Sequence, residues 1–209
     1  QSARGRGTYS ELVIAPESLF VLAPNGIPLV EAAAVPLATM TATQLLDKVS
    51  LAQGSRVLVT GAAGAVGRVV VQWLLQNGHE VACLARSYDR DDLTMLGATT
   101  VYSSILGIPR CAFDAVLDTA GIANTIAAVR DRGSFVSIAD NQQPKPERGI
   151  FPSKSYVQED SDKLKTIAEQ VSNHSITVPV GNRYALSETA SAHRDFEKGG
   201  LRGKVLLIP

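Results

Sequence analysis

The chain has 209 residues, 45% of them hydrophobic and 19% charged, and its 20 acidic and 20 basic residues cancel to a net charge of zero. This length suffices for one large domain, or for one domain and part of another. The charge balance gives no reason to expect nucleic acid or an anionic membrane as a partner, and no uninterrupted apolar run approaches the roughly 18 residues of a spanning helix. Cys83 and Cys111 lie far apart in the sequence and fit a reducing compartment better than a disulfide framework. We therefore expect a cytoplasmic α/β protein.

The first fifty residues are expected to form two short strands and then a helical stretch. Residues 8–15 alternate and are rich in β-forming types, and residues 18–23 are similar. Helical periodicity follows over residues 29–35 and 37–49, and Pro36 interrupts it.

After Gly54 the pattern changes to alternating strands and helices. The expected strands are residues 56–60, 80–85, 99–102, 113–118, 134–139 and 204–208. The expected helices are residues 65–76, 89–96, 122–130, 161–172 and 187–198, with a mobile loop at 141–154. Strands that alternate with helices in this way predict a doubly wound parallel sheet, the Rossmann fold.

The run VLVTGAAGAVGR at residues 57–68 joins a buried strand to an amphipathic helix. Gly61 permits the tight turn after the strand, Gly64 lets the backbone approach a pyrophosphate, and Gly67 allows close packing of helix on strand. The amides of Ala65 and Val66 open the helix and point with its dipole toward the anion. The strand–turn–helix context predicts a dinucleotide site.

The end of the second strand indicates which dinucleotide is bound. An acidic residue there would favour NAD, because it accepts a hydrogen bond from the ribose 2′-hydroxyl. This chain instead has Arg86 and Ser87, with Arg90 as a second candidate cation. These side chains suit a 2′-phosphate and predict NADPH as the cofactor, although solvated surface arginines remain the alternative.

Further segments carry a resemblance to a known family. They are GTYSELV (7–13), EAAAVPLATMTA (31–42), the glycine turn, LGA (96–98), FDAVLDTAG (113–121), GSFVSI (133–138), AHR (192–194) and GKVLL (203–207). In these segments and their order the chain resembles the zinc-independent, quinone oxidoreductase-like branch of the medium-chain dehydrogenases/reductases.

The resemblance implies a division of the chain and further cofactor contacts. Residues 1–35 would be a remnant of a GroES-like β domain, residues 36–185 the Rossmann domain, and residues 186–209 a helix and strand that return to the remnant. The residues implied to lie near the nicotinamide are Thr41, Thr119, Ile138 and Ala139. Local packing is the alternative for each of them.

The implied activity is NADPH-dependent hydride transfer to quinones, enones or related α,β-unsaturated carbonyls. No metal is expected, because the cysteine and histidine ligands of the zinc-dependent branch are absent from the sequence. We assign no catalytic residue, since His79, His174 and His193 lack a neighbouring acid–nucleophile pattern. The family also implies a homodimer, through the sheet edge at residues 134–139.

Two other hypotheses were weighed. A short-chain dehydrogenase would need a Tyr-x-x-x-Lys pair, and none of the five tyrosines is followed by a lysine at that spacing. A dinucleotide-binding module without turnover, a sensor or scaffold, stays open because most of the β-rich domain is missing from the resemblance. The sequence begins with Gln1, so we expect a fragment, a cleaved product or a shortened member of the family.

Overall fold

The computed structural model describes residues 7–140 and 143–209. It divides into two compact units, one made of Thr41–Tyr156 and the other of Gln1–Met40 with Val157–Pro209. These units differ from the domains expected from the sequence, because residues 157–185 fall in the same unit as the N-terminal segment and not with the sheet.

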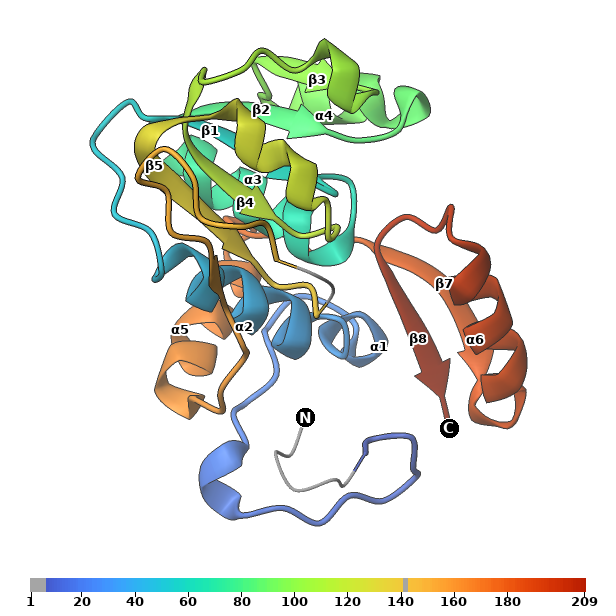
Figure 1. The fold of residues 1–209 in the computed structure, drawn as a ribbon. Helices are drawn as coiled ribbons and strands as arrows, with labels where there is room; N and C mark the ends of the chain where they lie inside the picture. Colours follow the sequence, from blue (N-terminus) through green and yellow to red (C-terminus); the bar gives the residue numbers. More distant parts are fainter. Residues whose placement is uncertain (1–6, 141–142) are drawn as a thin grey trace. The chain divides into compact units, whose positions relative to one another are not determined.

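The unit Thr41–Tyr156 is built on a six-stranded sheet, with the order β3-β2-β1-β4-β5-β6 among the described residues (Figure 1). Every neighbouring pair in it is parallel. The strands are β1 (Arg56–Thr60), β2 (Glu80–Leu84), β3 (Thr100–Tyr102), β4 (Phe113–Asp118), β5 (Val129–Ser137) and β6 (Ser153–Lys154). The chain first adds β2 and β3 on one side of β1 and then returns to add β4, β5 and β6 on the other side. The switch point between β1 and β4 is that of the doubly wound Rossmann fold.

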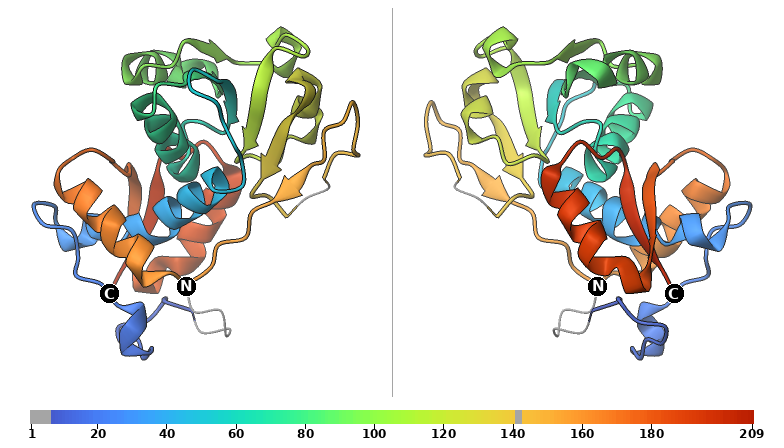
Figure 2. Two further views of the ribbon diagram at one scale, coloured as in Figure 1. Left: turned by 90° about the vertical axis from the view of Figure 1, so that its left-hand side faces the viewer. Right: turned by 90° about the vertical axis from the view of Figure 1, so that its right-hand side faces the viewer.

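Helices cover both faces of this sheet. They are α3 (Ala65–Gln76), η2 (Ser87–Asp89), α4 (Arg90–Leu96), η3 (Ile105–Gly107) and η4 (Ala123–Ala128). Figure 2 shows α3 and η4 on opposite sides of the strands. Val57, Leu58 and Val59 of β1 are fully buried, as expected for a central parallel strand whose side chains alternate between two covered faces.

Several elements confirm the sequence prediction to the residue, namely β1, α3, β4, α5 (Ser161–Ser172) and β8 (Lys204–Ile208). Helix α4 ends at Gly97, whose φ of 114° is the left-handed conformation that favours glycine after a helix. In the N-terminal half, α1 (Leu29–Ala32) and α2 (Val35–Leu46) bear out the two expected helices, with Pro36 in the first turn of α2.

The predicted strands at 8–15 and 18–23 are wrong. The described residues there form no strand, and only a short η1 (Glu17–Leu19) is regular. Leu12 and Ile14 are 85% and 83% exposed. A strand is stable only when a neighbour pairs its backbone, and no described segment pairs with this one.

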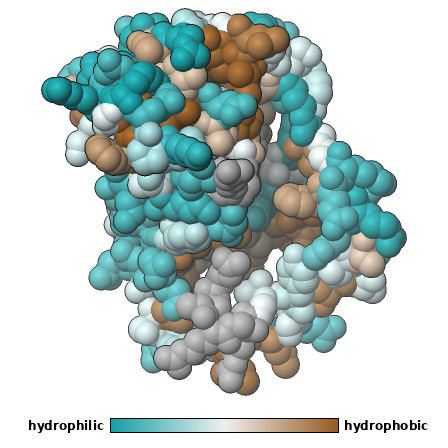
Figure 3. Space-filling view, in the orientation of Figure 1, coloured by the Kyte–Doolittle hydropathy of each residue, from teal (hydrophilic) through white to brown (hydrophobic). Residues whose placement is uncertain are grey.

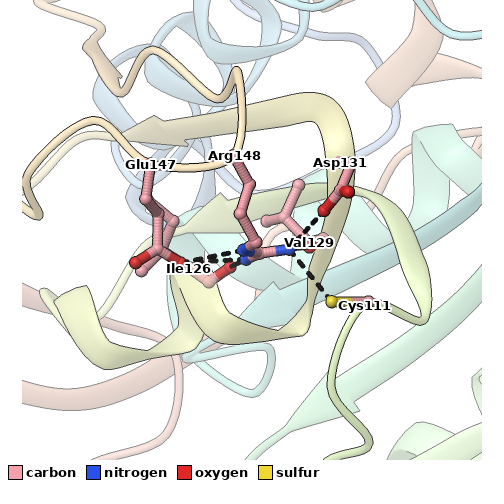
Figure 4. A network of polar contacts seen from close by, with 6 residues as sticks. All are labelled: Cys111, Ile126, Val129, Asp131, Glu147 and Arg148. Carbon is pink, nitrogen blue, oxygen red and sulfur yellow. Dashed lines mark hydrogen bonds and ion pairs between the residues drawn. The ribbon is translucent and has the colours of Figure 1, made fainter.

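The predicted helix at 122–130 is confirmed only in part: residues 123–128 form the 3-10 helix η4, and Val129, which begins β5, pairs with Phe113 of β4. Figure 4 shows the contacts of Arg148 with this segment. Arg148 donates hydrogen bonds to the carbonyl oxygens of Ile126 (2.9 Å) and Val129 (2.6 Å), and ion pairs hold its guanidinium to Glu147 and Asp131. Carbonyls near the end of a helix lack partners inside it, so these bonds help to hold the end of η4 and the start of β5 in place.

The expected loop at 141–154 contains the short strand β6, while residues 141 and 142 lie outside the described part. Because β6 pairs with β5, the predicted sheet edge at residues 134–139 is wrong. The outermost strand on that side is β6, among the residues that the structure describes.

The second unit has its own two-stranded parallel sheet, in which β8 pairs with β7 (Val180–Ala185). No strand was expected from the sequence at the position of β7. It is followed by η5 (Leu186–Glu188) and α6 (Thr189–Lys198). Tyr9 in the N-terminal segment contacts His193 of α6, with ring centroids 5.7 Å apart.

By length and composition alone, the helical stretch Leu29–Leu46 could cross a membrane. Ala34, Ala38, Ala42 and Leu45 of this stretch are fully buried in the fold, which is typical of a core helix. On the face drawn in Figure 3, hydrophilic residues predominate and hydrophobic ones form separate patches.

Candidate cofactor site

The glycine-rich turn lies between the buried end of β1 and the first turn of α3. Gly61 has a φ of +61°, and an added Cβ would lie 2.9 Å from the Thr119 hydroxyl. At Gly67, a Cβ would lie only 2.3 Å from the Gly61 carbonyl oxygen. The structure therefore gives a steric reason for glycine at both positions: a left-handed turn at Gly61 and close packing of the helix on the turn at Gly67.

Gly64 differs from the other two glycines. Its φ of −73° suits any residue, and an added Cβ would meet one atom within 4 Å, the Gly61 carbonyl oxygen at 3.2 Å. The fold alone therefore gives only a weak steric reason for glycine at this position. The space beside it is open, as a pyrophosphate cradle requires.

The first turn of α3 supplies hydrogen-bond donors. Gly64 is the N-cap, and no side chain caps the helix. Within the described chain, the contacts of the turn run from Gly64 N to Gly61 O and from Arg68 N to Gly64 O, both 2.9 Å. The first amides of an α-helix have no partner inside the helix, so those of Ala65 and Val66 fit an anionic group at this point.

A buried carboxylate links the ends of three strands. Asp118, the last residue of β4, is 1% exposed. Its Oδ1 accepts hydrogen bonds from the Thr60 hydroxyl (2.6 Å), the Ile122 amide (3.0 Å) and the Ala120 amide (3.3 Å). Its Oδ2 accepts one from the Ser137 hydroxyl at 2.9 Å. Thr60, Asp118 and Ser137 end β1, β4 and β5, so one side chain joins the carboxyl ends of all three.

The loops after β4 and β5 are tied to this carboxylate and to Thr60. The Thr119 amide donates to the Thr60 hydroxyl at 3.1 Å, and the Thr119 hydroxyl donates to the Thr60 carbonyl at 2.6 Å. The amide of Ile138 donates to the Asp118 carbonyl (3.1 Å), and that of Ala139 donates to the Ser137 hydroxyl (3.1 Å). The structure thus brings three of the predicted nicotinamide-side residues to adjacent strand ends.

The residues predicted to select NADPH follow β2, the neighbour of β1. Arg86, Ser87 and Arg90 are all exposed. The Arg86 guanidinium lies 5.6 Å from the centre of the Tyr88 ring and donates to its hydroxyl. An ordered guanidinium at this strand end is a suitable partner for an anion. Thr41 is half-buried on α2 and belongs to neither strand-end loop.

Sequence reasoning missed Asp118, Thr60 and Ser137. A carboxylate at the end of a buried strand, in the segment FDAVLDTAG, was the available indication. Its hydrogen-bond partners are up to 58 residues away, so no local pattern identifies them.

Potential metal ligands do not assemble. Among residues 7–140 and 143–209, no three His, Cys, Asp or Glu side chains are placed to hold a metal ion. Cys83 is buried in β2, and burial raises the pKa of its thiol to about 12. Cys111 is exposed and lies 3.0 Å from Arg148.

The strand order and the glycine turn at the switch point between β1 and β4 define a dinucleotide-binding Rossmann protein. A family model described as zinc-binding dehydrogenase matches residues 96–207, which is more than half of the chain. The chain belongs to this zinc-binding dehydrogenase family, within the medium-chain dehydrogenases/reductases.

Curated relatives of the chain include plant and bacterial oxidoreductases. The chain is 28% identical over 210 residues to a 2-methylene-furan-3-one reductase from Solanum lycopersicum, and 26% identical over 210 residues to a chloroplastic NADPH-dependent alkenal/one oxidoreductase from Arabidopsis thaliana. Each match covers 97% of this chain and 53% of the relative. A quinone oxidoreductase from Pseudomonas aeruginosa is 28% identical over 235 residues, with 97% and 72% covered. The chain therefore spans about half the length of the plant relatives.

Two solved structures are also similar. An NAD-dependent alcohol dehydrogenase superposes with a TM-score of 0.84 at 27% identity, over 97% of this chain and 65% of that one. A mycobacterial protein in complex with NADPH gives a TM-score of 0.78 at 26% identity, over 93% and 70% of the two chains. The fold is thus shared with proteins named for either nicotinamide dinucleotide.

Proposed function

We propose that this chain belongs to an NADPH-dependent reductase of quinones, enones or related α,β-unsaturated carbonyls, and that it forms the cofactor-binding part. The observation that carries the proposal is the turn Gly61–Gly67. It packs tightly where the fold requires glycine, and it leaves open space and uncapped helix amides where a pyrophosphate would be held. The named activities of the relatives support the substrate class.

In this proposal the chain's residues bind and orient the cofactor. The amides of Ala65 and Val66 hold the pyrophosphate, and the loops at Thr119 and at Ile138 with Ala139 line the nicotinamide end, together with Thr41. Bound NADPH supplies the hydride. Positioning and exclusion of water are then the protein's main contributions, and we assign no side chain as proton donor.

The preference for NADPH over NADH rests on the strand-end cations. Arg86, Ser87 and Arg90 stand where an acidic residue would favour NAD, and one relative's name and one similar structure include NADPH. A charge-assisted hydrogen bond contributes about 1.5–3 kcal/mol, which corresponds to roughly ten-fold or more in affinity.

Calorimetry with both cofactors tests this preference. We expect Arg86→Ala to weaken NADPH binding by roughly ten-fold or more and to leave NADH binding unchanged. Arg110→Ala is the matched control, because Arg110 is also exposed but precedes β4, at the amino end of the strands, whereas Arg86 follows the carboxyl end of β2. Equal affinities of the unsubstituted chain for NADPH and NADH would refute the assignment.

We further propose that the reaction needs no zinc, although the family's name includes it. The sequence contains two cysteines and three histidines, and its described donors do not cluster. Stoichiometric zinc in the purified protein, measured by elemental analysis, would contradict this proposal.

We also propose that the protein is a homodimer and that it acts in the cytoplasm. The outer edge of β6 is unpaired among the described residues, and an open strand edge is a ready site for pairing with a second copy. Sedimentation measurements test the dimer.

A binding module without turnover is the second candidate, because the observed features fit cofactor binding and we assign no side chain as a proton donor.

A further inference from the structure

Two parts of the strand-end site are held in different ways. The glycine turn is held by its own backbone bonds, by the bond from the Ala62 amide to the Leu84 carbonyl and by the packing of Gly67 on Gly61, and none of these contacts involves Asp118. The loop after β4 meets the start of the turn, where the Thr119 hydroxyl lies 3.5 Å from the Gly61 carbonyl oxygen. The loops that follow β4 and β5 are instead connected through Asp118. Loss of Asp118 would therefore disturb the loops while the turn keeps its internal support.

We propose that Asp118 is a positioning residue for the nicotinamide half of the cofactor, an inference that rests on the proposed function. Through Oδ1 it holds the loop at Ala120 and Ile122, and through Oδ2 it holds Ser137, whose hydroxyl in turn accepts the Ala139 amide. Both loops lie at the strand ends where the nicotinamide is expected. The pyrophosphate and adenosine contacts lie at the turn and after β2.

The chemistry of the pocket explains why a carboxylate stands here. Every hydrogen-bond partner of the Asp118 side chain is a donor: two hydroxyls and two backbone amides. A buried polar group is costly unless all its hydrogen bonds are made. An alanine at this position would leave the Thr60 hydroxyl, the Ile122 amide and the Ser137 hydroxyl without this acceptor, whereas the Ala120 amide also donates to the Thr60 hydroxyl oxygen at 3.2 Å. The loops would have to move to find new acceptors.

Asparagine is the conservative replacement. Its oxygen can take the place of Oδ1 and keep the bonds from Thr60, Ala120 and Ile122. Its amide group would then face the Ser137 hydroxyl, whose oxygen has two lone pairs and can accept from both this amide and Ala139. We therefore expect Asp118→Asn to keep the loops in place and Asp118→Ala to release them.

The experiment compares two ligands that differ only in the nicotinamide. NADPH carries both halves of the cofactor, whereas 2′-phospho-ADP-ribose lacks the nicotinamide ring. We expect Asp118→Ala to weaken NADPH binding by roughly ten-fold and to leave 2′-phospho-ADP-ribose binding unchanged within error. Asp118→Asn should restore NADPH affinity. Calorimetry on the full 209-residue chain measures both ligands without any need for turnover.

Asp114→Ala provides a matched control on the same strand. Asp114 lies near the start of β4, where its carboxylate accepts from the Arg56 amide at 2.6 Å and pairs with Arg130. Asp114 therefore also ties β4 to a neighbouring strand, β1, but at the amino end of the strands, whereas Asp118 lies at their carboxyl end. Asp114→Ala should lower the free energy of unfolding and leave the ratio of the NADPH affinity to the 2′-phospho-ADP-ribose affinity unchanged.

The outcomes separate the inference from the proposed function. If the unsubstituted chain binds neither ligand, the proposed function fails and the inference fails with it. If it binds both and Asp118→Ala weakens both equally or neither, the proposed function stands and the positioning role is wrong. Should Asp118→Ala not fold, Ser137→Ala decides by the same ratio, because it removes the bond to Oδ2 and the acceptor of the Ala139 amide and keeps the bonds to Oδ1.

Discussion

Replacement of Gly64 should abolish cofactor binding at little cost to the fold. An added Cβ at Gly64 meets only the Gly61 carbonyl oxygen, at 3.2 Å, and otherwise open space. The backbone there is extended, with a φ of −73° and a ψ of 168°, which a β-branched residue adopts readily. We expect Gly64→Val to lower the free energy of unfolding by about 1 kcal/mol or less.

The effect on binding should be much larger. A valine side chain at the N-cap would stand in the space that the pyrophosphate needs and would separate it from the amides of Ala65 and Val66. Loss of one charge-assisted hydrogen bond costs about 1.5–3 kcal/mol, so loss of two should weaken binding by a factor on the order of 100 or more. Calorimetry with NADPH measures the loss, and circular dichroism with thermal unfolding checks the fold.

Gly67→Ala provides the contrast. Its Cβ would lie 2.3 Å from the Gly61 carbonyl oxygen and 2.9 Å from the Ala62 Cα, and backbone atoms cannot move aside as a flexible side chain can. Overpacking of this kind costs about 1–3 kcal/mol, so Gly67→Ala should lower the melting temperature as well as the affinity. Tight NADPH binding by a folded Gly64→Val variant would refute the location of the pyrophosphate on this turn.

Two further predictions concern the thiols and turnover. At pH 8.5 iodoacetamide should modify exposed Cys111 and spare Cys83 until the protein unfolds. Burial raises the Cys83 pKa to about 12, and only the thiolate reacts. Equal rates of modification of the two thiols, measured by mass spectrometry, would contradict this prediction. The 209-residue chain should bind NADPH but reduce a model enone slowly. Positioning of the substrate accounts for several kcal/mol of a reaction's activation barrier, and the chain spans about half the length of its plant relatives. Efficient steady-state turnover by this chain would show that a complete site lies within it.

The central sheet was predictable because its strands are buried on both faces. β1 and β4 appear in the sequence as short apolar runs, and their bounds agree with the structure to the residue. Turn residues added further information, since Gly97 follows α4 in the left-handed conformation, as a glycine directly after the last predicted helical residue indicated. Local sequence determines these features, so local patterns suffice to identify them.

The errors occurred where distant residues decide the local structure. An α-helix was expected at 122–130, but only residues 123–128 are helical, because Val129 pairs with Phe113 of β4 and begins β5. β7 was missed because its residues are half-buried or exposed, and its backbone is paired by β8, which follows about twenty residues later. The stretch at 8–15 has strand-like alternation, but no described segment pairs with it.

The candidate site shows the same division between local and distant information. The glycine turn lies within seven residues, so its spacing between a strand and a helix predicted a pyrophosphate site, and the structure gives each glycine a distinct steric environment. The Asp118 carboxylate gathers donors from Thr60, from its own loop and from Ser137, which lie up to 58 residues from Asp118 in the sequence. Because parallel strands bring their carboxyl ends to one edge, the fold itself creates this arrangement. The glycine turn can thus be recognised from sequence, whereas the carboxylate that joins the loops after β4 and β5 becomes visible only when the strands are in register.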